Sequence, residues 1–316
     1  MLLSFSLIKS SGKLYSVHPL VHSWSRNRVQ KMDIDQQVLK TKAFLACSVK
    51  LDYTIDNYEY CGLLAPHIRT INNQASQLHL NNLYYDDECD QFSLVFHHIG
   101  SWDEVEKLRM WMLERRKANL APKHQFVLAS MINLSSTYWK QGRWDEAEKL
   151  QVQVLEASKE KLGSQHPETL NCMANLSSTY RNQGRWDEAA KLQVQVMEAR
   201  KERLGLQHPK IFSSMANLAS TYTCQGRWDE AEKLFVKVIE ASKEKIGSHH
   251  PLNTLTIMAN LAFTYRNQGR FPEAEKLFVE VMEARKEKLG SQHPDTLTSM
   301  ANLALTYREQ GRLHAA

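Results

Sequence analysis

The side chains best suited to binding chemistry in this 316-residue chain are amides and cations that recur at fixed positions. An amide offers a donor and an acceptor, which suits the backbone of an extended peptide, and a guanidinium can grip a carboxylate. One asparagine stands in every internal repeat, at Asn133, Asn175, Asn217, Asn260 and Asn302. The cations beside this column are Lys140, Arg181, Arg266 and Arg308. The two columns predict a surface that binds a peptide or a protein.

A structural role is the alternative interpretation of the asparagine column. Its repetition also follows from recent duplication of one unit, and an amide can bridge adjacent repeats and hold the array in shape. The sequence leaves both interpretations open.

Other residue types do not form a catalytic or metal-binding pattern. The Asp-Glu pairs that begin the second helix of each repeat suit the helix dipole. No phosphate loop, nucleophile elbow or zinc-protease motif is present. Histidines recur before the first helices, where no further metal ligands recur at fixed spacing, at His124, His166, His208, His250 and His293. These histidines are predicted to cap or pack the helices, and we expect no enzymatic activity, no cofactor and no bound metal.

A repeat of 42 residues, with one step of 43, sets the elements that hold these columns. A fixed period of this size indicates a stacked array in which each unit buries its apolar face against its neighbours. Apolar residues at helical spacing predict one helix after Pro167 and a second from Trp186 to Gly205. The glycines that begin the GRWDEAEKL-like motif are Gly100, Gly142, Gly184, Gly226, Gly269 and Gly311. We expect the paired helices to cross closely at Ala189, Ala231 and Ala274.

The pattern resembles the tetratricopeptide repeat (TPR), and its long period, MANLA core and LGSQHP linker are similar to the repeats of kinesin light chains. The third unit fits the repeat consensus at Leu218, Ala219, Tyr222, Gly226, Ala231 and Phe235. The resemblance implies an all-α, right-handed TPR superhelix (α-solenoid) whose first helices line a concave groove. In kinesin light chains and related clamps the matching asparagines contact bound peptide, so the resemblance implies that role here.

The region before the array lacks the 42-residue repeat and resembles a different family. Residues Phe5 to Val29 resemble the last strand and helix of the winged-helix part of an NB-ARC switch protein, where a Met-His-Asp motif faces the nucleotide. Only His18 matches that motif, and we expect it to lie at a strand–helix junction. Leu63 to Ile68 resembles the helical linker that follows in such proteins. We therefore expect a winged-helix-like remnant over 1–32, a helical linker over 33–91 and a TPR array over 92–316, with about five repeats and the last one truncated.

Composition restricts the partners and the compartment. The net charge of +5 is mildly basic, but both signs alternate along the helices, which is typical of a solvated face and not of a nucleic-acid surface. The first ten residues are too few and too polar for a signal peptide or a membrane span. Five cysteines without a C-x-x-C pair indicate neither disulfides nor zinc. We expect a cytoplasmic protein that binds no nucleic acid and no membrane. Helix packing is predicted for Trp102, Trp144, Trp186 and Trp228.

The sequence favours an interaction scaffold, as the sensor arm of an NB-ARC-type switch of the kind found in many fungal proteins. A kinesin-light-chain-like cargo adaptor is the alternative, although no heptad coiled coil precedes the repeats. The last unit stops just inside its second helix, so Met300, Leu303 and Tyr307 lack a covering helix. Because solenoids need capping repeats for solubility, we expect self-association through this uncapped C-terminal repeat.

Overall fold

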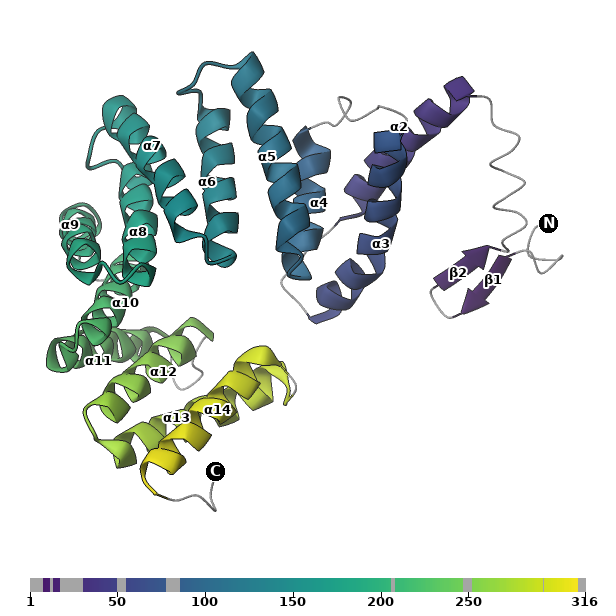
Figure 1. Ribbon diagram of the computed structural model, residues 1–316. Coiled ribbons are helices and arrows are strands. Elements are labelled where there is room, and N and C mark those ends of the chain that lie inside the picture. The colour runs from purple at the N-terminus through teal and green to yellow at the C-terminus, as the bar shows by residue number, and fades with distance from the viewer. Residues whose placement is uncertain are drawn as a thin grey trace. The chain divides into compact units, whose positions relative to one another are not determined.

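The structure is a computed structural model that describes residues 8–11, 14–17, 31–49, 55–77, 86–205, 208–246, 252–291 and 293–311. These residues are helical apart from one hairpin, in which β1 (Ile8–Ser11) pairs antiparallel with β2 (Leu14–Val17). The helical class is confirmed, and Figure 1 shows the order of the elements. His18 lies outside the described residues. The chain divides into two compact units, Met1–Thr137 and Tyr138–Ala316.

The first unit is a cluster of helices around one main apolar core and a second, smaller apolar cluster. Its described helices are α2 (Lys31–Ser48), α3 (Ile55–Gln77), α4 (Asp86–His98), α5 (Trp102–Asn119) and the beginning of α6 (Gln125–Lys140). The helix α4 packs against α2, α3 and α5. Residues that are almost fully buried in this core include Cys61, Ile68, Phe92, Phe96 and Met112. Helices α2 and α3 lie largely within the range 33–91 that was expected to be helical, whereas the three-part division of the chain stays a prediction.

The second unit continues as successive helix pairs in which each helix packs against the next. Its described helices are α7 (Trp144–Leu162), α8 (Pro167–Asn182), α9 (Trp186–Leu204), α10 (Pro209–Cys224), α11 (Trp228–Ile246), α12 (Leu252–Asn267), α13 (Phe271–Leu289) and α14 (Pro294–Glu309). Within this unit the pairs follow a curved path, with α8 toward the inside and α9 toward the outside (Figure 1). We call the first helix of each repeat, α6, α8, α10, α12 and α14, an A helix, and the second a B helix.

Local sequence explains where these helices begin and end. Gly184 separates α8 from α9 with φ of 79°, a conformation that other residues rarely adopt. The helix α8 begins at Pro167, whose missing N–H costs nothing at this position. Nδ1 of His166 accepts a hydrogen bond from the backbone N–H two residues later, and His208 and His293 cap α10 and α14 in the same way. Nδ1 of His124 accepts the same bond from the N–H of Phe126 at the beginning of α6, so the predicted capping role is confirmed for these four histidines.

The contact between paired helices follows the expected register, but the tryptophan column does not. Trp102 packs against the core of the first unit as expected, whereas Trp144, Trp186 and Trp228 are 36%, 41% and 37% exposed, so the expected packing is only partial at these three positions. Each is the first residue of its helix, where neighbouring helices cover only part of the ring. The alanines predicted at the crossing are fully buried, at Ala189, Ala231 and Ala274.

Buried polar side chains join successive repeats in the α7–α10 region. The hydroxyl of Thr179 in α8 donates to Oε1 of Gln151 in α7 over 2.7 Å. Thr221 in α10 donates to Gln193 in α9 over 2.8 Å. In the next two repeats the glutamine position holds buried phenylalanines, Phe235 and Phe278. These rings pack against apolar residues of α12 and α14.

A buried arginine alternates with a serine at another position of the B helices. Arg200 of α9 donates from Nη1 to Oγ of Ser214 in α10 over 2.8 Å and from Nη2 to Oδ1 of Asn171 in α8 over 2.7 Å. Arg285 of α13 makes the corresponding bonds to α12 and α14. Serine occupies the same position in the intervening B helices, at Ser158 and Ser242. Three helices are therefore tied together at every second repeat.

Candidate functional site

The asparagine column lies along one face of the A helices and keeps its side-chain hydrogen-bonding groups available. Asn175 is exposed and the other four asparagines are half-buried. No side-chain amide of the column bonds to another residue in the part of the chain that the structure describes. The bridging of adjacent repeats that a structural role requires is therefore not seen among these residues.

A column of buried threonines runs beside the asparagines. Each asparagine is followed four residues later by a buried threonine, whose hydroxyl donates to the backbone carbonyl of that asparagine. The oxygen–oxygen distances are 3.2 Å for Thr137, 3.3 Å for Thr179, 3.1 Å for Thr221, 2.9 Å for Thr264 and 2.9 Å for Thr306. Because residues four apart lie on neighbouring parts of a helix surface, the asparagines stand at the edge of the buried seam.

Two arginines of the cationic column are largely withdrawn from water. Arg181 forms no ion pair or hydrogen bond with another described residue, and burial lowers its pKa from the ordinary value because desolvation disfavours the cation. The side chain of Arg266 is only 10% exposed, and its Nε lies 3.6 Å from Oε2 of Glu309. Its Nη1 is buried without a hydrogen-bond partner among the described residues. Lys140 and Arg308 are exposed.

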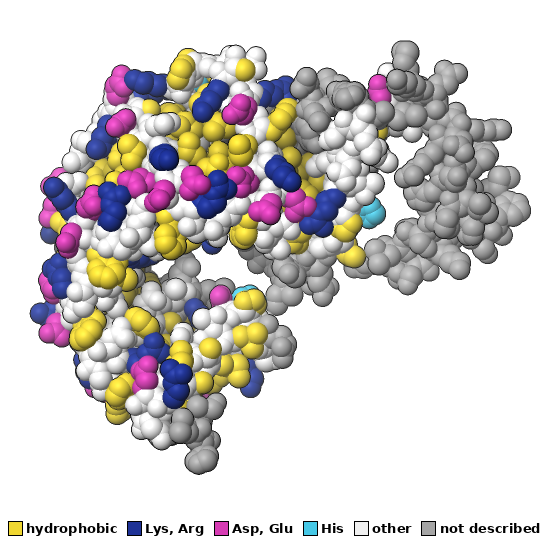
Figure 2. Space-filling view, viewed as in Figure 1, with side chains coloured by type: hydrophobic (Ala, Val, Ile, Leu, Met, Phe, Trp, Pro, Cys, Tyr) yellow, Lys and Arg dark blue, Asp and Glu magenta, His cyan; other side chains and the backbone are white. Residues whose placement is uncertain are grey.

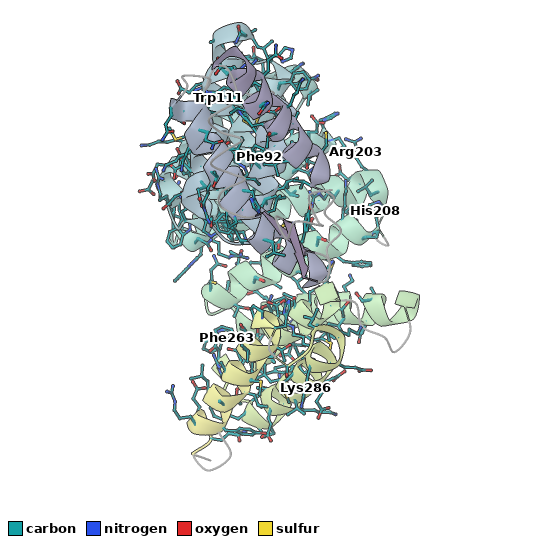
Figure 3. All side chains as sticks on the ribbon, turned by 90° about the vertical axis from the view of Figure 1, so that its right-hand side faces the viewer. Phe92, Trp111, Arg203, His208, Phe263 and Lys286 are labelled. Carbon is teal, nitrogen blue, oxygen red and sulfur yellow. The ribbon has the colours of Figure 1, made fainter. Side chains whose placement is uncertain are left out.

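One position of this face changes from polar to apolar along the second unit. Three residues after the asparagine stands a serine in α8 and α10, at Ser178 and Ser220, whereas α12 has Phe263 and α14 has Leu305. Phe263 is 40% exposed, and the guanidinium carbon of Arg266 lies 4.8 Å from its ring centroid. Figure 3 places Phe263 on a different side of this region from Lys286 of α13. Sequence reasoning missed Phe263, although the replacement of NLSSTY by NLAFTY was a visible signal.

The histidines and acidic residues do not assemble into another site in the described ranges. No group of three or more potential metal ligands comes together there. His250 lies outside the described residues. Lysine, arginine and carboxylate side chains are interspersed on the face shown in Figure 2, so that face carries no broad patch of one sign.

The repeat family matches over four overlapping stretches. The tetratricopeptide repeat matches residues 126–202, 173–244, 210–266 and 253–316, which together make up more than half of the chain. The chain belongs to the tetratricopeptide repeat family. TPR solenoids are typically scaffolds for protein–protein interaction and are generally not enzymes. The expected TPR fold is therefore confirmed from α6 onward.

Solved structures share this architecture. A Podosopora anserina protein, described as a kinesin light chain with nearly identical TPR-like repeats, is 26% identical, with 64% of this chain and 95% of that chain covered and a TM-score of 0.54. BtubC (BKLC) from P. vanneervenii is 17% identical, with coverages of 82% and 94% and a TM-score of 0.53. NprR, solved in complex with its cognate peptide NprX, is 14% identical, with coverages of 83% and 74% and a TM-score of 0.53. The last two show similarity of fold alone.

Two further findings concern curated relatives and membranes. No curated protein matches the sequence. Among the helices in the described ranges, none combines the length and the apolar character needed to cross a bilayer.

Proposed function

We propose that this TPR protein is a scaffold that binds an extended peptide, or an extended segment of a partner protein, along the asparagine face of its A helices. The observation that carries the proposal is the asparagine column itself, whose amides have no hydrogen-bond partner among the described residues. An amide that supports the array would be expected to use its donor and acceptor within the protein, because buried polar groups are normally paired. The resemblance to kinesin light chains supports the same face.

The cations of this face favour a ligand with carboxylate groups. A guanidinium that is mostly buried without a full set of acceptors is costly, and an acidic ligand would supply them. Arg266 has a buried Nη1 that lacks a partner among the described residues, and Arg181 has no hydrogen bond or ion pair with them. Phe263 offers an apolar contact beside Arg266. We therefore expect the ligand to carry an acidic residue near Arg266 and polar backbone contacts along α8 and α10.

The test is a selection from a random peptide display library, followed by affinity measurements on the enriched peptides. Asn217→Ala and Asn260→Ala are each expected to weaken binding by on the order of 1 kcal/mol or more, because the ligand loses a hydrogen bond, with little change in melting temperature. Arg266→Ala should weaken acidic peptides preferentially, and more strongly at low salt. Gln195→Ala, an exposed change on the B helix α9, is the matched control and should leave affinity unchanged.

The competing structural role makes the opposite prediction for the same variants. Large stability losses in Asn217→Ala and Asn260→Ala, with unchanged affinity of the folded fraction, would eliminate the peptide-binding role.

A kinesin-light-chain-like adaptor is the second candidate, and the structural relative at 26% identity favours it. The family match and the relatives give no support to the NB-ARC-type switch. The adaptor candidate is tested by the binding of cargo-derived peptides, and their failure to bind to a chain that still binds the selected peptides would contradict it. Because no phosphate loop occurs in the sequence, we expect no nucleotide binding by this chain in a calorimetric titration.

We keep a cytoplasmic location and self-association through the C-terminal repeat as parts of the proposal. In support of self-association, Met300 of α14 is 47% exposed, whereas Met258 at the same position of α12 is 1% exposed. Leu303 is buried against α13, so the exposed apolar surface is smaller than expected. A light-scattering mass equal to one chain at high concentration would contradict self-association.

A further inference from the structure

A pocket in the first unit is lined by residues that do not belong to the asparagine face. It has a volume of 430 Å³ and opens between α3 and α5, with Phe96 of α4 among its lining residues. The α3 side of the lining consists of Arg69, Asn72, Asn73 and Ser76, and the α5 side of Glu104, Lys107, Leu108 and Trp111. On each helix these residues follow the spacing i, i+3, i+4 and i+7, so two facing stripes form the walls. One wall is wholly polar, whereas the other ends in apolar side chains.

Trp111 differs in type from the residues at the matching position of the later B helices. The corresponding positions of the later B helices hold polar residues, namely Gln153, Gln195, Lys237 and Glu280. Part of the Trp111 ring packs against the apolar core of the first unit, and the guanidinium carbon of Arg115 lies 5.3 Å from its centroid, so that the remaining surface of the ring lines the pocket. Trp111 is only partly buried, whereas Phe92 of the same unit is fully buried (both are labelled in Figure 3). The exceptional residue stands in the wall of the pocket.

The charges around the pocket favour an anionic group. Arg69 and Glu104 form a bidentate ion pair that neutralises both side chains. Lys107 is an exposed ammonium one turn from Glu104, to which it is attracted, but it forms no ion pair or hydrogen bond with a described residue. Asn73 adds an exposed amide that can donate and accept. Pockets of roughly 300–1,000 Å³ with apolar walls and a few convergent polar groups are typical of ligand sites.

We propose that this pocket binds a carboxylate carried next to an aromatic side chain. The ring lies against Trp111, beside Leu108, while the carboxylate meets Lys107. The chemistry is shared by the carboxyl terminus of a peptide that ends in phenylalanine and by a free N-acylated aromatic amino acid. The site is independent of the proposed function of the asparagine face, because none of its residues belongs to that face.

The test uses calorimetric titration of the whole chain with N-acetyl-L-phenylalanine and with acetyl-Gly-Gly-Phe, each also as its C-terminal amide. Both acids are expected to bind. Trp111→Gln introduces the residue found at this position in α7 and α9, and it should weaken binding about tenfold through the loss of an aromatic contact. Lys107→Gln should weaken the acids several-fold but leave the amides unchanged, because the lost partner is the carboxylate. Tighter binding of the tripeptide supports a peptide terminus, and tighter binding of the amino acid supports a free acid.

Two controls separate this site from the rest of the molecule. Lys149→Gln changes the exposed lysine at the matching position of α7, and Asn217→Ala changes the asparagine face, so neither should alter the titration. Absence of binding by all four compounds would overturn the proposal. Equal affinities for wild type, Trp111→Gln and Lys107→Gln would overturn it as well.

Discussion

The α7–α10 region and the α11–α14 region use the same backbone positions to join their repeats, but with different chemistry. In the former, a buried threonine hydroxyl is paired with a glutamine amide at each of two junctions. In the latter, Phe235 and Phe278 replace the glutamines and are fully buried. Burial of apolar area tolerates small shifts, whereas a buried hydrogen bond depends on distance and direction. Nearly identical repeats can therefore form junctions that respond differently to the same perturbation.

The largest effect is expected from removing an aromatic ring in the α11–α14 region. Phe278→Ala leaves a cavity against α14 and should lower the free energy of unfolding by about 3–5 kcal/mol. Chemical denaturation followed by circular dichroism measures the loss. Gln193→Ala at the corresponding position of α9 is the comparison and should cost clearly less. Equal losses would show that the two junctions are energetically alike.

A smaller effect is expected from breaking the hydrogen bond in the α7–α10 region. Thr221→Val removes the hydroxyl that Gln193 accepts from, and Nε2 of Gln193 is already buried without a described partner. Leaving a buried polar group unpaired should cost about 1–3 kcal/mol in denaturation experiments. Thr306→Val is the matched control, because the hydroxyl of Thr306 bonds to its own helix and faces a junction with Phe278. If both variants lose the same stability, the polar junction has no special energetic role.

Overpacking the helix crossing should affect the two regions equally. Ala189 and Ala231 are both fully buried where a B helix meets its partner. Replacing either with leucine forces side chains out of their preferred rotamers, at a cost of about 1–3 kcal/mol. The melting temperatures of Ala189→Leu and Ala231→Leu should fall by similar amounts. An unchanged melting temperature for Ala231→Leu would show that the crossing is not close-packed.

The smallest effect concerns the turns. Arg185 bonds to Glu148 of the preceding repeat, and Arg270 bonds to Glu232. Arg227 lacks such a partner, because Ala190 stands at the glutamate position. Ala190→Glu should add an ion pair that stabilises the protein by at most about 1 kcal/mol, and salt should reduce the gain. A thermal melt at two ionic strengths checks both expectations, and a gain that persists at high salt would contradict an electrostatic origin.

The 42-residue period predicted most of the fold, because aligning the repeats gives the helix spacing, the turn glycines and the buried alanines. The histidine caps could also be predicted from the sequence, because a histidine just before each A helix stands next to backbone N–H groups that need an acceptor. The partners of buried side chains in neighbouring helices could not be predicted in this way. The pairing of Gln151 with Thr179 joins residues 28 apart, and it depends on the rotation of one helix against another. Trp111 and Phe263 each differ in type from the residues at the matching positions of the other repeats. These differences are visible when the repeats are aligned, and they were the available signal for both residues.

The arginine that alternates with serine along the B helices has a consequence for how the gene can change length. Arg200 meets Ser214 on the next A helix and Arg285 meets Ser299, whereas Ser158 meets Cys172. A recombination that deletes α10 with α11 would bring Arg200 against Ile257 of α12, with buried donors left unmatched. A deletion of α8 with α9 instead removes Arg200 and brings Ser158 against Ser214. We therefore expect viable one-repeat deletions to remove an arginine-bearing B helix, so that the two kinds of repeat are not interchangeable units of inheritance.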